Sequence, residues 1–341
     1  MLQIIATLFT EKVIDVHAHI YTKKFLKELA SRTSYPLANT SPDGFRVVQF
    51  NEKLAHKVPD SFVDLDFRLK EMNRFSVTTQ LVSATNPWTD VFPTTELALR
   101  YSRMINEEIS TIAKDSKGRF LGLATLPLLS PEDAAEELVR VVDELGLCGA
   151  IIATNVGGTH LSDPKFDPVF EAAAKKRAVV FLHPTAPLGG DKLKDYGFVR
   201  SIGYTFETTT CVLKMAYAGL FEKYPSLRIL TAHLGGNLPY LRGRIDTAWK
   251  KFPESKGNLS EPPMKKIRDA LYADSISYDD GALRLGTEFF GMERIMFGTD
   301  FPFEWGIKEA RESLESAIVD KGQLRAIYHE NFERLLESVR H

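Results

Sequence analysis

The sequence predicts an α/β protein folded as a (β/α)₈ barrel, a TIM barrel, with a small insertion after the first strand. Short, nearly continuous apolar runs recur along the chain, as expected for parallel strands that are buried on both faces. Stretches with helical periodicity lie between them. About eight such strand–helix units fit a chain of 341 residues as one barrel. A doubly wound parallel sheet is the alternative.

Each element follows from its own pattern. Helical periodicity predicts helices at residues 131–139, 167–176, 207–224 and 309–319. The first of these opens with Ser130 as N-cap, Pro131 at the first position and acidic residues in the first turn. The predicted strands are the apolar runs at residues 13–16, 79–83, 120–124, 149–153, 178–182, 227–231, 271–274 and 294–298.

The insertion is predicted at about residues 31–60. This segment is rich in Pro, Asn, Ser and Asp and is too long for a plain loop. We expect it to lie over one mouth of the barrel. Because the chain contains no internal repeat, low-complexity tract or flexible linker, residues 1–341 are predicted to form a single domain.

Composition limits the partners and the compartment. The chain is 44% hydrophobic and 26% charged, as in ordinary globular proteins. A net charge of −2 argues against nucleic acid or an anionic membrane as the main partner. Cys148 and Cys211 lie in apolar surroundings, which is typical of buried cysteines in a reducing compartment. The apolar residues 2–9 are too short to span a membrane and lack the flanks of a signal peptide, so we expect a cytoplasmic protein.

Two histidines, His17 and His19, lie where the first apolar run ends. Side chains alternate between the two faces of a strand, so residues two apart point the same way. Imidazole is a frequent metal ligand, and two imidazoles on one face provide half of a metal site. The pair alone is a weak signal, because a polar strand end is commoner than a metal site.

Three further apolar runs end in residues of the same kind. His183 follows the fifth run, His233 the sixth and Asp300 the eighth. Active sites of these barrels form where the carboxyl ends of the strands converge. His17, His19, His183 and Asp300 would together make a three-nitrogen, one-oxygen set that suits Zn²⁺ or a similar divalent ion. The other histidines, His56, His160 and His329, lack this setting, and we expect them to be solvated or to cap helices.

The stretches around these residues, Asp15-Val16-His17-Ala18-His19, His183-Pro184, His233-Leu234-Gly235-Gly236 and Gly298-Thr299-Asp300-Phe301-Pro302, resemble the amidohydrolase superfamily. More narrowly they resemble its aminocarboxymuconate-semialdehyde decarboxylase branch, from the first strand to the last helix. The resemblance implies that His17, His19, His183 and Asp300 hold one metal ion, with His233 outside the shell as acid/base. His233 and Asp300 are then the catalytic residues. The fourth strand lacks the lysine with which binuclear relatives bridge two metals, so we predict one ion, zinc.

Two arginines extend the resemblance to substrate binding. The segment Gly44-Phe45-Arg46-Val47-Val48 resembles the one whose arginine binds a substrate carboxylate. Arg244 lies in a segment that resembles the helix whose arginine reaches the neighbouring subunit's site, which implies a homodimer. A planar guanidinium suits carboxylate recognition, although both could be ordinary surface arginines. Residues 194–200 contain none of the tryptophans that line the family's substrate pocket. The resemblance therefore predicts the metal chemistry better than it predicts the identity of the substrate.

The predicted activity is decarboxylation of a small unsaturated or aromatic carboxylic acid. A divalent ion lowers the pKa of bound water from about 16 towards 7, and a histidine can accept a proton at neutral pH. The same groups could hydrolyse an ester, lactone or amide, or hydrate a double bond. Decarboxylation is favoured because Arg46 and Arg244 would recognise a carboxylate. A barrel that keeps its metal only as a structural staple is the non-enzymatic alternative.

Overall fold

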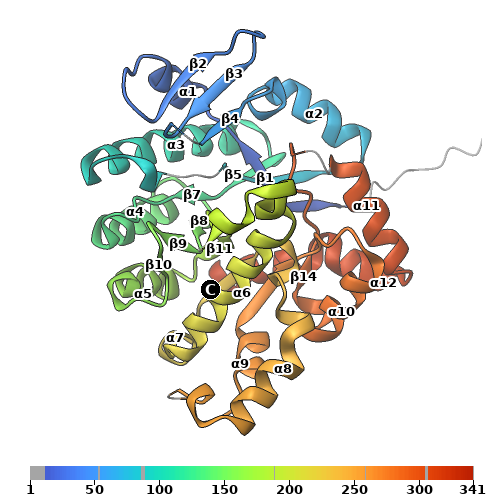
Figure 1. The fold of residues 1–341 in the computed structure, drawn as a ribbon. Coiled ribbons are helices and arrows are strands. Elements are labelled where there is room, and N and C mark those ends of the chain that lie inside the picture. The colour runs from blue at the N-terminus through green and yellow to red at the C-terminus, as the bar shows by residue number, and fades with distance from the viewer. Residues whose placement is uncertain are drawn as a thin grey trace, which may run out of the picture.

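The computed structural model describes residues 12–52, 54–85, 89–187, 189–257, 259–303 and 306–340, and its ribbon is shown in Figure 1. Parallel strands form the central wall, in two sheets of order β1-β5-β6 and β14-β13-β12-β11-β8-β7. The strands of the wall are β1 (Ile14–Ile20), β5 (Thr79–Ala84), β6 (Phe120–Gly122), β7 (Ala124–Thr125), β8 (Gly149–Ala153), β11 (Val179–His183), β12 (Arg228–Thr231), β13 (Leu271–Asp274) and β14 (Ile295–Met296).

Backbone hydrogen bonds join the two sheets into a closed ring. β6 and β7 are parts of one extended segment, in which the Leu123 N–H donates to Val82 O at 2.9 Å. β6 pairs with β5 and β7 with β8. On the other side, the Val16 N–H donates to Phe297 O, just after β14, at 2.8 Å. The described residues therefore form a barrel of eight parallel strand positions, and the predicted fold class is confirmed.

Helices follow the strands and lie outside the wall (Figure 1). The N-cap of α4 (Pro131–Asp143) is as predicted, since the Ser130 side chain accepts from the Asp133 N–H at 3.4 Å. The predicted helix over residues 207–224 is instead divided into α6 and α7 at Gly219, whose φ is +77°. The helices are α1 (Lys23–Ala30), α2 (Leu65–Arg74), α3 (Thr95–Asp115), α4 (Pro131–Asp143), α5 (Asp167–Lys176), α6 (Tyr204–Tyr217), α7 (Leu220–Lys223), α8 (Leu238–Lys251), α9 (Pro263–Ala270), α10 (Asp280–Phe290), α11 (Gly306–Ala317), α12 (Lys321–Arg325) and α13 (Asn331–Arg340).

The segment at residues 31–60 contains a small antiparallel sheet of β2 (Leu37–Thr40), β3 (Arg46–Gln49) and β4 (Ala55–Lys57). Val48 is opposite both Ala38 and His56 and is fully buried. Helix α1 (Lys23–Ala30) separates β1 from this segment, and beyond the segment Phe62 O accepts from the Tyr21 N–H at 2.9 Å. This bond holds the far end of the insertion at the carboxyl end of β1. That residues 1–341 form one domain stays a prediction.

A buried arginine ties α2 to the strands next to the predicted site. Arg68 donates to Gln80 Oε1 at 3.1 Å and to His19 O at 2.5 Å, and its guanidinium lies over the Phe301 ring. Gln80 in turn donates to Asp15 Oδ2 at 2.9 Å. Burial lowers the pKa of Arg68 to about 9, against the opposing effect of Asp15. This network fixes the backbone of β1 at His19.

Candidate metal centre and active site

The imidazoles of His17 and His19 meet the Asp300 carboxylate inside the barrel. Both histidines are fully buried, and their Nε2 atoms are 3.0 Å apart. Asp300 Oδ1 is 3.2 Å from His17 Nε2 and 3.1 Å from His19 Nε2. The pairing of β1 with β5 shifts register between Asp15 and Ala18, an irregularity of the kind that redirects side chains at active sites.

His183 and His233 complete the cluster. The His183 ring centroid is 5.1 Å from those of both His17 and His19. One potential ligand atom each from His17, His183, His233 and Asp300 lies within 4.8 Å of the others. The structure thus brings together all five residues that ended apolar runs in the sequence.

The three predicted histidine ligands have their Nδ1 atoms directed at fixed partners. His17 Nδ1 is 2.7 Å from Asp274 Oδ2, His183 Nδ1 is 2.8 Å from Pro184 O, and His19 Nδ1 is 3.2 Å from Ser83 Oγ. A carboxylate or carbonyl only accepts, so Nδ1 of His17 and of His183 carries the proton. Metal-binding histidines characteristically donate their other ring N–H in this way.

His233 is held differently. Its Nε2 is 3.6 Å from Asp300 Oδ2, the oxygen opposite to the one that His17 and His19 approach. Its Nδ1 is buried and has no hydrogen-bond partner among the residues that the structure describes. The Asp300 carboxylate therefore has His17 and His19 beside Oδ1 and His233 beside Oδ2.

Electrostatics favours a cation at this point. Burial lowers the pKa of His17, but Asp300 and Asp274 outweigh burial and raise it to about 10. Burial would raise the pKa of Asp300, but His17, His19 and His233 hold it well below its usual range. Burial and the neighbouring histidines keep the pKa of His183 well below its ordinary value. Asp300 is thus a carboxylate and His183 a neutral imidazole.

The donor set fits a divalent ion of the zinc type. Separations of 3.0–3.2 Å between His17 Nε2, His19 Nε2 and Asp300 Oδ1 suit atoms that share an ion at bond lengths of about 2.0–2.2 Å. The three atoms converge on one region in which a positive charge is stabilised, and an ion bound there would replace the proton on His17 Nε2.

The end of the fourth barrel strand carries a polar cluster of a different kind. Asn155 Nδ2 donates to Glu207 Oε1 at 2.7 Å and to Ala186 O at 3.1 Å. His160, in the hairpin of β9 (Asn155–Val156) and β10 (Thr159–His160), lies 3.9 Å from the same Glu207 oxygen. The expectation that His160 is solvated is wrong, because only 5% of this residue is exposed. Its side chain lies beside Glu207 of α6, a contact between distant positions that the local sequence does not reveal.

Arg46 begins β3, on the face of the small sheet that carries the fully buried Val48. Its Nη1 atom is buried and has no hydrogen-bond partner among the described residues. His56, opposite Val48 on β4, lies 3.5 Å from the hydroxyl of Tyr21, two positions beyond His19. The inner face of the insertion therefore adjoins the end of β1 that carries the metal-type ligands.

Arg244 is not part of the buried cluster. It is exposed in the second turn of α8, the helix that follows the left-handed residues Gly235 and Gly236. Its exposure fits either a surface arginine or one that reaches a second chain.

Sequence reasoning missed two residues beside the cluster, Asp274 and Tyr278. Asp274 ends β13 and is fully buried. A carboxylate at the end of an apolar run was the available signal, the same one that identified Asp300. Burial, with Asp300 and Asp274, raises the pKa of Tyr278, so its phenol stays neutral close to both carboxylates. Its position in a loop gave no signal.

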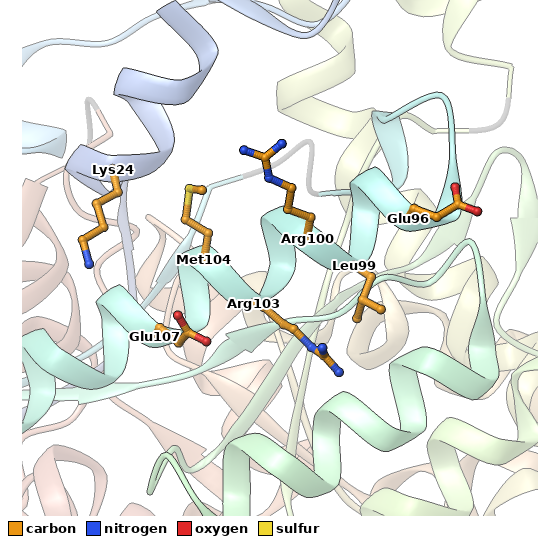
Figure 2. Close-up of a pocket in the computed structure, with 7 residues that line it drawn as sticks. All are labelled: Lys24, Glu96, Leu99, Arg100, Arg103, Met104 and Glu107. Carbon is orange, nitrogen blue, oxygen red and sulfur yellow. The ribbon is translucent and has the colours of Figure 1, made fainter. Parts of the chain in front are cut away.

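A surface pocket of about 580 Å³ lies elsewhere, between α1 and the outer side of α3 (Figure 2). Its lining combines cations and anions, several of them in exposed ion pairs such as Arg100 with Glu28 and Arg140 with Glu107. It contains none of the cluster residues and we give it no role. It is lined by Lys24, Glu96, Leu99, Arg100, Arg103, Met104 and Glu107.

Among the described helices, none combines the length and the apolar character that crossing a membrane requires.

Comparisons with known proteins agree with this geometry. The family model for amidohydrolases matches residues 14–337. The chain is 29% identical over 305 residues to a 2-amino-3-carboxymuconate-6-semialdehyde decarboxylase of Dictyostelium discoideum, covering 89% of this chain and 85% of that protein. It is 30% identical over 292 residues to a gamma-resorcylate decarboxylase of Rhodococcus jostii, covering 80% and 87%.

Among solved structures, the apo form of the Metarhizium anisopliae IDCase superposes with a TM-score of 0.84 at 28% identity, covering 96% of this chain and 97% of that one. The match of nearly the whole chain to the family model confirms what the motifs predict. This chain belongs to the amidohydrolase family, in its aminocarboxymuconate-semialdehyde decarboxylase-like branch.

Proposed function

We propose that this protein is a metal-dependent decarboxylase of a small unsaturated or aromatic carboxylic acid. His17, His19, His183 and Asp300 hold one divalent ion, and His233 is the acid/base. The observation that carries the proposal is the division at Asp300, with His17 and His19 on Oδ1 and His233 on Oδ2. The curated relatives named above are decarboxylases, which fits the predicted class of enzyme.

Decarboxylation replaces a carbon–carboxylate bond with a carbon–hydrogen bond and releases CO₂, so a proton must reach the carbon that loses the carboxylate. A bound divalent ion supplies Lewis acidity and lowers the pKa of a bound water. His233 can hold and move the proton through Nε2, which lies 3.6 Å from Asp300 Oδ2. Phe181 and Phe303, whose rings pack on His17 and His19, keep this region apolar.

Arg46 is the proposed ligand for the substrate carboxylate. Its Nη1 atom is buried and finds no hydrogen-bond partner among the described residues, and Arg46 lies on the inner face of the small sheet. The relatives' names describe an aminocarboxymuconate semialdehyde and a resorcylate, which share a carboxylate on an unsaturated carbon. We therefore place this protein's substrate in that chemical class. The neutral phenol of Tyr278 can donate a hydrogen bond to it.

We further propose zinc as the ion and a cytoplasmic location. Zinc follows from the donor set of three imidazoles and one carboxylate. Cys148 and Cys211 are not joined in a disulfide, which supports a reducing compartment.

A homodimer is proposed because apolar side chains are exposed beside Arg244. Tyr240 on α8 is 79% exposed and Phe206 on α6 is 53% exposed. The two helices meet where Asn237 Nδ2 donates to Thr205 Oγ1 at 3.2 Å. Large exposed aromatic side chains at one junction are typical of an interface. A second copy placed here would bring Arg244 towards a neighbouring site.

The test is CO₂ release from a panel of muconate-type and hydroxybenzoate-type acids, with the metal content measured on the same protein sample. We expect one equivalent of zinc per chain, CO₂ with at least one acid, and loss of activity after chelation. Two equivalents of metal, or none after reconstitution, would contradict the single-ion site. One equivalent of another ion, such as manganese, would replace zinc and leave the mechanism standing.

Ester, lactone and amide substrates, and acids with an isolated double bond, belong in the same panel. Turnover of these without CO₂ from any acid would replace decarboxylation by hydrolysis or hydration. A loss of thermal stability after chelation, with no turnover by the metal-loaded protein, would favour the structural staple. A metal site that only stabilises the fold would not need His233 beside Asp300.

A further inference from the structure

Asp274 is a fully buried carboxylate that accepts four hydrogen bonds around the cluster. Its Oδ2 accepts from His17 Nδ1 at 2.7 Å and from the His233 N–H at 3.0 Å. Its Oδ1 accepts from the N–H groups of Leu234 at 2.9 Å and Ile276 at 3.1 Å. One side chain at the end of β13 thus contacts both a proposed metal ligand and the backbone of the proposed acid/base.

The backbone at His233 needs such a partner. His233 and Leu234 have φ of +55° and +54°, a left-handed conformation that L residues rarely adopt. In this conformation their successive N–H groups point to one side, where they form a binding site for an anion. The Asp274 carboxylate fills that site. The location of the His233 imidazole therefore depends on Asp274.

The ring of His17 needs the same carboxylate for another reason. Because a carboxylate only accepts, His17 keeps a proton on Nδ1, and Nε2 is the atom that gives up its proton when the ring binds a cation. That leaves the Nε2 lone pair directed at the point shared by His19 Nε2 and Asp300 Oδ1.

We propose that Asp274 is a positioning residue that sets two functional groups at once: the tautomer of His17 and the turn that carries His233. The part that concerns His233 rests on the proposed function. The part that concerns His17 does not, because it is measured by metal binding.

The test is Asp274→Asn. The amide oxygen can replace only one carboxylate oxygen. If it accepts from Leu234 and Ile276, the amide N–H₂ faces His17 and donates to Nδ1, which moves the imidazole proton to Nε2 and removes the metal-binding lone pair. We expect the affinity for zinc, measured by competition with a chromophoric chelator, to fall by about 10- to 100-fold. Turnover should fall as well, in kcat more than in KM.

A measurement on the zinc-loaded wild-type protein keeps the proposal testable if the variant does not fold. Nitrogen-15 NMR of labelled histidine should show a slowly exchanging proton on His17 Nδ1, shifted downfield by its contact with the carboxylate. Absence of that proton in the wild-type protein would overturn the proposal. So would wild-type zinc affinity in a folded Asp274→Asn variant.

Asp15→Asn is the matched control. Asp15 is also a fully buried carboxylate with four hydrogen bonds, but these come from the backbone of His17 and Thr299 and the side chains of Thr299 and Gln80, and from no imidazole ring. It should lower stability without moving the His17 proton. An equal loss of zinc affinity in both variants would reduce Asp274 to general structural support and refute the proposal. Since zinc affinity and the proton position do not require turnover, a failure to release CO₂ would count against the proposed function alone.

Discussion

The side chain of His233 is held less firmly than those of the other histidines around it. His17 and His183 donate through Nδ1 to oxygen acceptors, whereas His233 Nδ1 has no hydrogen-bond partner in the described part of the chain. The His233 ring packs on those of His17 and His183, with centroids 5.4 Å apart in both cases, but its polar contact is with the Asp300 carboxylate. Without a fixed partner on Nδ1, such a ring can shift during proton transfer. This freedom suits an acid/base better than a ligand.

We therefore predict that His233→Ala keeps its metal and loses turnover by about 10²-fold or more, as when a general acid/base is removed. Metal content and kcat are measured on the same sample. His329→Ala is the control, because His329 pairs with Glu333 and is not part of the cluster, and this variant should keep full activity. Loss of metal from His233→Ala would make His233 a ligand. The structure allows that arrangement, because one potential ligand atom of His233 lies within 4.8 Å of those of His17, His183 and Asp300.

Among the elements, the small sheet of β2, β3 and β4 reaches the end of β1 through His56. The ring of His56 on β4 packs on that of Phe50, with centroids 5.2 Å apart, and its Nδ1 faces the Tyr21 hydroxyl. Burial, reinforced by the charge of Arg200, lowers the pKa of His56 to about 4. The imidazole is therefore neutral in the folded protein at pH 7.

This shift predicts a pH dependence of stability. An unfolded histidine has a pKa of about 6.5, so between about pH 6.5 and pH 4 the unfolded chain binds a proton that folded His56 does not. The contribution of His56 to the free energy of unfolding is therefore complete above pH 6.5 and declines as the pH falls through this window. Urea unfolding at pH 7 and pH 5 measures the difference. His56→Gln, which cannot titrate, should show a smaller fall; an equal fall in both proteins would contradict the assignment.

At the scale of the whole molecule, ring closure makes the site. β1 lies between β5 and the segment after β14, so His17 and Asp300, 283 positions apart in the numbering, become hydrogen-bonded neighbours through Asp300 N–H and His17 O at 2.8 Å. Arg244 lies exposed on α8, outside this ring of strands, where it could reach a second chain.

Complementation tests whether Arg244 serves a second copy. Arg244→Ala and His233→Ala chains are each expected to be nearly inactive. In a mixed dimer, one site would combine native His233 of one chain with native Arg244 of the other. After refolding an equal mixture, we expect about a quarter of wild-type activity, since half of the dimers would be mixed and each would hold one intact site. Mixed dimers without activity would show that Arg244 acts within its own chain or only structurally.

The sequence by itself determined the class of fold and the residues that end its strands. His17, His19, His183, His233 and Asp300 were all visible because a polar residue that closes an apolar run is a local signal, and parallel barrel strands place their carboxyl ends together. The helix at α4 was equally local, since its cap and first turn are adjacent in the chain.

Only the tertiary structure decided how these residues are held. The contact between His17 and Asp274 joins positions 257 apart, and no pattern along the chain records which buried carboxylate will face which ring. Two other features depend likewise on which surfaces pack together. His160 is buried beside Glu207, and Arg46 has a buried Nη1 atom on the inner face of the small sheet. Periodicity reports the face of an element, whereas the closed barrel decides which buried polar groups come within hydrogen-bond distance of one another.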